Sequence, residues 1–337
     1  MTSQIGTSRV TIGVDRAREL AERSLRGLDY SAEEATIIAD HLVEAGLAGY
    51  EFASLPRVLV LERWEERTKR RPIRVVERSR ARAVVDGGGN CGYLAVRVAT
   101  EVAIELVKES GIAIVSVSNT RYSGRLAYYV RMVVEAGFVS LHFSGGYPSV
   151  APYGGRKRAL GTNPIAFGFP TATGPVVFDT ATSALSWGEI ELAETAGNRL
   201  PEGMALDVDG TPTTDPTAAL AGATVPFAGY KGYGFSVVSQ LFAVLAGEEL
   251  LDGHVRTTGE VLIVIDPEFL APGGHFSERA AEVIGHLRAT PPADGHDSVR
   301  VPGDGSSRTR ERLLASGLTY DSVVLDALES IARRVSA

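Results

Sequence analysis

The chain has 337 residues, of which 44% are hydrophobic and 22% charged, an ordinary composition that excludes a disordered or fibrous protein. Its 41 acidic and 34 basic residues give a net charge of −7, which argues against a nucleic-acid partner. Cys91 is the only cysteine, so an intrachain disulfide is excluded. No run of about 18 apolar residues occurs, and residues 1–13 lack a signal-peptide pattern. We expect a cytoplasmic protein without a membrane partner.

The N-terminal part of the chain predicts a small helical lobe. Residues 14–28 place their apolar side chains on one helical face. Ser31 and Glu34 match a capping box, which predicts that a second helix starts there. A third apolar face runs through residues 55–64. We therefore assign residues 1–75 to an N-terminal helical lobe.

Residues 63–82 are densely charged, and Pro72 interrupts them. The pattern predicts a solvated helix end and a linker. A basic patch that binds a phosphate group or a nucleic acid is the alternative.

From residue 82 onward, the pattern alternates between strands and helices. Short apolar runs predict strands at 82–86, 111–118, 137–144, 165–170, 175–180 and 260–266. The first three of these strands, with the helices between them, give a β-α-β-α-β arrangement.

Helical spacing of apolar residues predicts helices over 93–109 and 123–136. Residues 233–247 are apolar nearly all round, which is typical of a buried helix. We assign residues 76–275 to a mixed α/β core. The segment 276–337 is expected to be helical and to pack on the N-terminal lobe.

A glycine-rich loop, GGGNCG at 87–92, follows a strand and precedes a helix. That context suits phosphate binding at a helix N-terminus, but a tight strand-to-helix turn is the simpler interpretation. The spacing of the dinucleotide-binding fingerprint is not met, so a standard Rossmann domain is not expected. The six histidines show no metal-ligand spacing, so we expect no metal.

The most informative run covers residues 159–188. It combines a Gly-Thr-Asn-Pro turn, a strand that ends in Asp179, and the polar run Thr-Ala-Thr-Ser. Hydroxyl groups placed after a strand can hydrogen-bond phosphate or ribose oxygens. Downstream, GYKGYG at 229–234 sets Lys231 near glycines, where it can approach an anion closely.

Five motifs together resemble the type-2 malate/L-lactate dehydrogenase family, in its order and spacing, over roughly residues 15–335. They are GTNPIAFGFP (161–170), DTATS (179–183) with Gly188, LPEGMALDVDGTPTTDP (200–216), YKGYG (230–234) and VRVPGD (299–304). The family includes ureidoglycolate dehydrogenase, diketogulonate reductase, sulfolactate dehydrogenase and the reductase of cyclic 2-imino acids.

The resemblance implies an NAD(P)-dependent oxidoreductase that uses NADPH or NADH. It implies an α/β fold with a family-specific, non-Rossmann cofactor-binding core and a helical lobe built from both termini. It also implies a homodimer with each active site near the subunit interface. By family match, the cofactor-binding residues are Ser144, Asp179, Thr180, Ala181, Thr182, Ser183, Tyr230, Lys231, Gly303 and Asp304.

The sequence departs from the family at its Ser-His-Gly motif. The family's histidine is the usual proton donor or acceptor, and an arginine four residues later binds the substrate carboxylate. Here Phe52, Ala53 and Ser54 occupy the motif, while Arg57 is retained. Arg57 is thus expected to hold a carboxylate through a bidentate pair. A salt bridge on a helix is the alternative.

A second family motif, Asn-Ser-x-His-(Phe/Tyr)-Gly, corresponds to NTRYSG at 119–124. Tyr122 replaces its histidine, while Asn119 and Gly124 remain. Both family histidines are therefore missing. The expected substrate-pocket residues are Phe52, Ala53, Ser54, Asn119, Thr162 and Asn163.

Three explanations for the missing histidines stay open. Tyr122 can serve as the acid, although a free phenol has a pKa of about 10, with Arg121 or Arg125 nearby to strengthen it. Alternatively, the substrate is an imine that arrives already protonated. Thirdly, the chain has lost its activity and acts as an NAD(P)-binding or partner subunit. Asp207 is a candidate for orienting a catalytic group, and a role in a turn is the alternative.

We expect a reductase that acts on a C=N or C=O carbon next to a carboxylate, in a cyclic 2-imino acid or a 2-oxo acid. Its proton source is altered, because the family's histidines are replaced by Ala53 and Tyr122. The imine is favoured slightly over the ketone.

Overall fold

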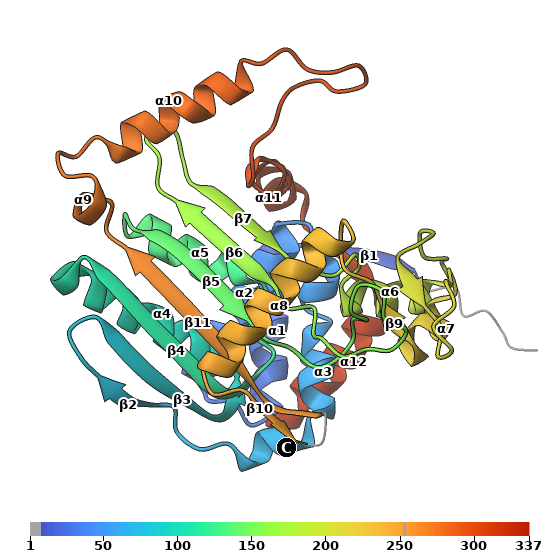
Figure 1. Ribbon diagram of the computed structural model, residues 1–337. Helices are drawn as coiled ribbons and strands as arrows, with labels where there is room; N and C mark the ends of the chain where they lie inside the picture. The colour runs from blue at the N-terminus through green and yellow to red at the C-terminus, as the bar shows by residue number, and fades with distance from the viewer. Residues whose placement is uncertain (1–7, 252–253, 337) are drawn as a thin grey trace, which may run out of the picture. The chain divides into compact units, whose positions relative to one another are not determined.

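A computed structural model describes residues 8–251 and 254–336 (Figure 1). The chain forms two compact units. Unit 1 consists of the residues up to Arg70 together with those from Gly303 onward, and unit 2 runs from Arg71 to Pro302. The C-terminal segment of unit 1 thus begins at 303, whereas the sequence placed this boundary at 276. The intervening residues stay with unit 2, where the Ala172 N–H donates to the Ser277 carbonyl at 3.1 Å.

Unit 1 is helical and is built from both ends of the chain. Its α-helices are α1 (Val14–Arg26), α2 (Ala32–Leu47), α3 (Arg57–Arg63), α11 (Asp304–Ser316) and α12 (Ser322–Ala332). Strands β1 (Arg9–Ile12) and β12 (Leu318–Asp321) pair in antiparallel fashion. Short 3-10 turns are η1 (Glu51–Ala53), η2 (Glu65–Lys69) and η3 (Arg333–Ser336).

Two local features explain how unit 1 is held together. The predicted capping box is confirmed: the Ser31 hydroxyl accepts from the Glu34 N–H, and the Glu34 carboxylate accepts from the Ser31 N–H. Helix α12 packs on α1, where the Ser24 hydroxyl donates to the Leu328 carbonyl at 3.0 Å. A Cβ on Gly27 would lie 2.2 Å from the Ile331 carbonyl oxygen, so this contact requires glycine. A helical lobe from both termini is therefore confirmed.

Unit 2 is organised around an eight-stranded sheet in the order β2-β3-β4-β11-β5-β6-β7, with β10 paired to β11. The strands are β2 (Arg74–Arg78), β3 (Arg82–Cys91), β4 (Ile112–Arg121), β5 (Val139–Ser144), β6 (Ile165–Phe169), β7 (Val176–Thr180), β10 (Glu249–Leu251) and β11 (His254–Ile265). Strands β3 and β4 are parallel, joined by helix α4 (Gly92–Ser110), and the other pairs of this sheet are antiparallel.

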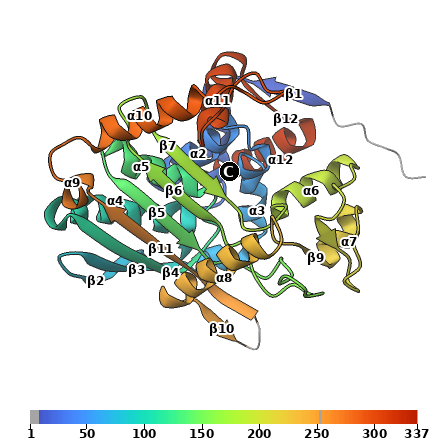
Figure 2. The ribbon, with the colours of Figure 1, turned by 45° about the horizontal axis from the view of Figure 1, so that its top comes forward.

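The two faces of the sheet carry different helices. Helices α4 and α5 (Leu126–Glu135) cover one face, and α8 (Tyr230–Leu245) crosses the other over β5 and β11 (Figure 2). Successive side chains of β5 point to opposite faces of the sheet, which explains why neighbouring residues contact different helices. Phe143 stacks on Phe242 of α8 at 4.2 Å between ring centroids, while the neighbouring His142 lies against Tyr129 of α5. An apolar core of Val, Leu and Ala residues fills the α4/α5 side.

The remaining elements of unit 2 lie outside this sheet. They are α6 (Trp187–Ala196), α7 (Pro216–Ala221), the small pair β8 (Ala205–Leu206) and β9 (Ala223–Thr224), α9 (Pro267–Leu270) and α10 (Phe276–Arg288). None of the helices in the described part of the chain has the length and apolar character needed to cross a bilayer.

Two sequence interpretations need correction. Residues 74–78 were expected to lie in a charged linker. They form the edge strand β2 instead, and the residues of this strand are all exposed. Helix α8 is not buried all round, because Leu241 and Leu245 are 63% and 76% exposed. One apolar face of α8 packs on the sheet and the other points to solvent in the single chain.

Residues 87–91 of the glycine-rich motif belong to strand β3, whose pairing with β4 is irregular between Asp86 and Asn90, and α4 begins directly at Gly92. A Cβ on Gly88 would meet the Arg71 carbonyl oxygen at 2.4 Å, and one on Gly87 would meet the Asn119 carbonyl oxygen at 2.8 Å. The side-chain amide of Asn90 donates to the Arg71 carbonyl at 2.6 Å. The motif is thus an irregular end of β3 that runs straight into α4, rather than the tight turn expected from the sequence, and its backbone packs closely on Arg71 and Asn119.

Candidate functional site

The segment DTATS leaves the end of β7 and lies beside the start of α8 in unit 2. The N–H and the hydroxyl of Thr182 both donate to the Thr162 carbonyl, at 2.8 and 2.9 Å. The N–H of Phe227, three residues before α8, donates to the Thr182 carbonyl at 3.1 Å. Two predicted site residues, Thr162 and Thr182, are therefore joined directly.

Asn163 connects the same region to α8. It is fully buried with φ +36°, and its side-chain amide donates to the Ser236 carbonyl at 3.1 Å and to Gln240 Oε1 at 3.0 Å. Nearby, the Ser239 hydroxyl donates to the carbonyl of Ser144 at 2.9 Å. Asn163 and Ser144 therefore bond directly to α8, and Thr162 and Thr182 are joined to each other and to the segment that precedes this helix.

The first turn of α8 carries the predicted pair Tyr230 and Lys231, both exposed. Gly229 precedes it with φ +64°, and a Cβ on Gly232 would lie 2.1 Å from the Phe227 carbonyl oxygen. Backbone N–H groups at a helix start point away from the helix and favour an anion. With the lysine beside them, the donor set here fits a pyrophosphate.

The side chains of DTATS make bonds that the sequence did not indicate. Asp179 Oδ2 accepts the N–H of Ala127, in the first turn of α5, at 2.8 Å. Burial raises the pKa of Asp179, and the charge of Arg125 and the Ala127 bond offset part of this rise. The hydroxyls of Thr180 and Ser183 donate to the carbonyls of Ala181 and Leu185, at 2.9 and 2.7 Å.

Tyr122 lies in the loop between β4 and α5, with φ +57°, and the residue is 36% exposed. Asn119, three residues earlier, donates its amide to Asp86 Oδ1 at 2.9 Å. Burial favours the neutral form of Asp86, but bonds from the Gly88 N–H and Asn119 outweigh it and lower its pKa. The side chain of Asn119 therefore supports the irregular, glycine-rich part of β3.

Asp207 lies in the loop that follows β8, where its carboxylate closes a turn. Its Oδ1 accepts the N–H groups of Asp209 and Thr211, both at 2.9 Å. Such an Asx arrangement is a common role for aspartate. The geometry supports the turn role that the sequence left open.

The other predicted residues belong to unit 1. Ala53 and Ser54 are buried, and the Ser54 hydroxyl is 2.8 Å from the Tyr320 hydroxyl. Phe52 meets Tyr50 edge to face at 6.1 Å between centroids.

Arg57 begins α3 and is partly buried. In the described part of the chain, its guanidinium has no hydrogen-bond or ion-pair partner, so the helix salt bridge considered as an alternative is not formed there. Gly303, with φ +100°, precedes α11, and Asp304 is the first residue of that helix.

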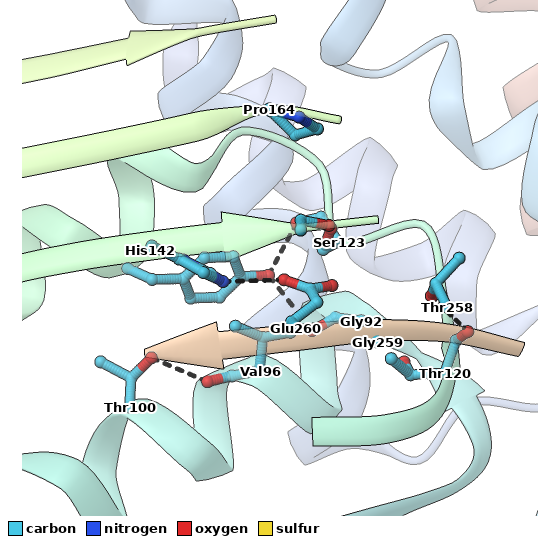
Figure 3. Close-up of polar contacts among 12 residues, drawn as sticks. Gly92, Val96, Thr100, Thr120, Ser123, His142, Pro164, Thr258, Gly259 and Glu260 are labelled. Carbon is cyan, nitrogen blue, oxygen red and sulfur yellow. Dashed lines mark hydrogen bonds and ion pairs between the residues drawn. The ribbon is translucent and has the colours of Figure 1, made fainter. Parts of the chain in front are cut away.

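Sequence reasoning missed three buried ionisable groups of unit 2. Glu248 is 5% exposed, and burial raises its pKa to about 7. Glu260 and His142, at most 1% exposed, are 2.8 Å apart between Oε2 and Nε2 (Figure 3). The sequence pattern that could have revealed this pair is a glutamate inside the apolar strand EVLIVID and a histidine inside another strand. Among the described residues, no group of histidine, cysteine and acidic side chains has the arrangement of a metal site.

Comparison with known proteins identifies the family. The malate/L-lactate dehydrogenase family model matches residues 12–329. L-sulfolactate dehydrogenase of Methanocaldococcus jannaschii is 30% identical over 310 residues, covering 89% of this chain and 90% of the relative. Δ1-pyrroline-2-carboxylate/Δ1-piperideine-2-carboxylate reductase of Pseudomonas putida is 36% identical over 259 residues, covering 73% and 74% of the two chains.

The fold comparison agrees with the sequence match. A dehydrogenase of Sinorhizobium meliloti superposes with a TM-score of 0.90 at 32% identity, over 97% of this chain and 99% of that one. The predicted α/β fold is thereby confirmed, and dehydrogenases of this family use nicotinamide cofactors. The chain belongs to the malate/L-lactate dehydrogenase family and is an oxidoreductase of that type.

Proposed function

We propose that the chain is an NAD(P)H-dependent reductase of a C=N or C=O carbon that carries a neighbouring carboxylate. The observation that carries the proposal is the donor set at the start of α8, where the first-turn N–H groups lie beside Lys231. By the family resemblance, Ala53 and Tyr122 occupy the positions of the family's two histidines. A degenerate chain has little reason to keep that donor set. The similarity to a reductase named for pyrroline-2-carboxylate and piperideine-2-carboxylate supports a cyclic 2-imino acid as substrate.

The cofactor would be held in unit 2 by backbone and hydroxyl groups. The first-turn N–H groups of α8 and Lys231 would bind the pyrophosphate, and residues 180–183 would contact the ribose and phosphate oxygens. Bound NADH or NADPH supplies the hydride. Tyr230, exposed beside Lys231, offers an aromatic surface to the same ligand.

The substrate carboxylate would be bound by Arg57. A guanidinium presents two parallel N–H donors that match a carboxylate in a bidentate pair. The guanidinium of Arg57 is not engaged within the described part of the chain, so it can bind such an anion without first losing a partner.

The proton source decides between imine and ketone. Reduction of a ketone delivers a hydride to carbon and a proton to oxygen, and a positioned acid contributes about 10²–10⁴-fold. Ala53 has no proton to give, whereas the Tyr122 hydroxyl can donate one. A cyclic imine protonated in solution accepts the hydride at carbon and becomes the amine without an enzymatic acid. We therefore infer that imines react readily and that ketones depend on Tyr122.

Turnover of matched substrates tests this function. The purified protein is assayed with NADH and NADPH against cyclic 2-imino acids and their open-chain 2-oxo counterparts, alongside Tyr122→Phe. We expect imine reduction to survive Tyr122→Phe and ketone reduction to fall at least tenfold. Tyr128→Phe is the control, because it removes a tyrosine hydroxyl from α5, the helix that follows the Tyr122 loop. The Tyr128 hydroxyl accepts a hydrogen bond from Arg97 of α4 at 3.1 Å. Cofactor binding without any turnover would favour the binding or partner subunit instead.

We also propose that a second copy of the chain covers the outer face of α8. Val238, Leu241 and Leu245 recur at helical spacing and are 45%, 63% and 76% exposed. Exposed apolar stripes of this kind mark association surfaces. Sedimentation velocity should show a dimer that Leu241→Glu dissociates, whereas a monomeric wild-type chain would contradict the proposal.

A further inference from the structure

The loop that carries Tyr122 has an unusual backbone. It runs from the end of β4 at Arg121 to the start of α5 at Leu126. Tyr122 has φ +57° and Gly124 has φ +71°. A tyrosine rarely adopts a positive φ, so the surrounding structure must hold the loop in this conformation.

The start of α4 supports the loop from one side. A Cβ on Gly92 would lie 2.6 Å from the Cα of Ser123, a distance that real Cβ atoms essentially never show. The backbone of α4 and the backbone of the loop are therefore in direct contact, and Gly92 allows that approach.

Tyr129 of α5 holds the same loop by hydrogen bonding. Its hydroxyl is fully buried and lies 2.8 Å from the Ser123 carbonyl oxygen and 3.2 Å from that of Gly92. A phenol has one proton to donate, so the shorter contact, to Ser123, is the principal bond. Burial raises the pKa of Tyr129 well above its ordinary value, and the charge of Glu260 adds to this effect. Tyr129 thus keeps its proton for the loop.

The environment of Tyr129 is fixed by a buried pair from the centre of the sheet. His142 of β5 and Glu260 of β11 are diagonal neighbours on the α5 side, because Leu262 is the register partner of His142. Figure 3 shows their contact, with Ser123 and Gly92 nearby. The His142 ring meets the Tyr129 ring edge to face at 5.8 Å. Tyr129 therefore has little freedom to turn its hydroxyl away.

Asp179 holds the far end of the loop. Its Oδ2 accepts the N–H of Ala127, one of the first-turn donors of α5 that have no partner within the helix. Arg125, the residue before α5, has a non-helical backbone and no side-chain cap bond. Asp179, from the end of β7, therefore supplies the cap that the local sequence lacks.

We propose that Tyr129 and Asp179 are positioning residues that fix, from two ends, the loop that presents Tyr122. This assignment rests on the proposed function, in which Tyr122 donates the proton for ketone reduction. It also changes the role of Asp179. The sequence resemblance placed Asp179 at the cofactor, whereas its carboxylate ties the DTATS segment to the helix that follows the proton donor.

The test combines an activity measurement with one that needs no activity. Tyr129→Phe removes the hydroxyl but keeps the ring, and Tyr128→Phe is the matched control on the adjacent residue. Asp179→Ala removes the cap, while Asp179→Asn keeps an oxygen that can accept from Ala127. Hydrogen exchange of the amides at 123–127 reports loop order, and kcat and KM are measured with a 2-oxo acid.

We expect Tyr129→Phe and Asp179→Ala to speed hydrogen exchange in the loop about tenfold. This is the change that corresponds to the loss of one net hydrogen bond. The same variants should lower kcat about tenfold with KM for the 2-oxo acid nearly unchanged. Asp179→Asn should restore most of both properties, and Tyr128→Phe should alter neither. Added to Tyr122→Phe, the Tyr129→Phe change should cause no further loss of kcat.

Unchanged exchange in Tyr129→Phe and Asp179→Ala would overturn the proposal, as would faster exchange with unchanged kcat. If Tyr129→Phe fails to fold, the contrast between Asp179→Ala and Asp179→Asn decides. Full ketone reduction by Tyr122→Phe alone would instead refute Tyr122 as the acid. In that case, the exchange measurement still shows whether Tyr129 and Asp179 hold the loop.

Discussion

The side-chain amide of Gln240 donates to the carboxylate of Glu248, and the Gly259 N–H approaches its other oxygen at 3.3 Å. No cation pairs with Glu248 in the described part of the chain. Two neutral donors do not compensate for removing a charge from water, which is why the pKa of Glu248 rises to about 7.

This raised pKa predicts a pH-dependent loss of stability. Below pH 4.5, Glu248 is neutral in both the folded and unfolded states, and its contribution to the free energy of unfolding is fully present. As the pH rises through about 7, ionisation favours the unfolded state, at a cost of up to about 3 kcal/mol. Glu248→Gln should therefore unfold at higher urea concentration than wild type at pH 8, with a smaller difference at pH 5. The control is Glu249→Gln, an exposed neighbour, and equal pH profiles for all three proteins would contradict the prediction.

Gly232→Ala should weaken cofactor binding. The new Cβ would meet the Phe227 backbone oxygen at 2.1 Å, so the start of α8 must shift. Fluorescence titration with NADPH and NADH should show at least a tenfold higher Kd. Gly234→Ala is the matched control, because a Cβ there meets nothing within 4 Å. An unchanged Kd in Gly232→Ala would show that the cofactor does not use this helix start.

Arg57→Lys should raise KM for the carboxylate substrate at least tenfold while the Kd of the cofactor stays constant. Lysine keeps the charge but loses the planar pair of donors. Arg57→Leu should act in the same direction and more strongly. The contribution of Arg57 to carboxylate binding is measured by comparing the steady-state KM for a substrate acid with the KM for the corresponding amide. Equal loss for acid and amide would mean that Arg57 does not bind the carboxylate.

Ser54→Ala should destabilise unit 1 by about 1–3 kcal/mol, because it leaves the buried hydroxyl of Tyr320 without its bond to Ser54. Adding Tyr320→Phe should recover part of that loss, since neither partner is then left unpaired. Urea unfolding of the two single variants and the double variant completes the cycle. Additive losses would mean that the two hydroxyls do not stabilise each other.

Local patterns predicted much of the fold. The six predicted apolar runs form the strands β3, β4, β5, β6, β7 and β11, because short runs of apolar and β-branched residues are typical of strands. Strand β2 was not predicted from the sequence, because an exposed edge strand needs no apolar face and the sequence RVVER resembles the charged run around it. Its pairing with β3 is visible only in the folded chain.

The site was harder to predict than the elements, because its bonds join distant parts of the chain. The family resemblance placed Asp179 at the cofactor, but the structure bonds its carboxylate to the N–H of Ala127, 52 residues away. Glu260 and His142 are separated by 118 residues. Each looks like an isolated polar residue in an apolar strand, and only the sheet register brings them together. Local sequence patterns do not specify such pairs.

The division of unit 1 between the two ends of the chain has a consequence for synthesis. Helix α1 is made before unit 2, but α12, which packs on α1, is made after it. The complete sheet of unit 2 lies between them in the sequence. Unit 2 can therefore fold before α12 has been made, whereas the side of α1 that packs on α12 lacks this partner until then. A ribosome that stalls before α12 would leave a chain whose sheet can form but whose helix α1 presents its α12-facing side to chaperones and proteases.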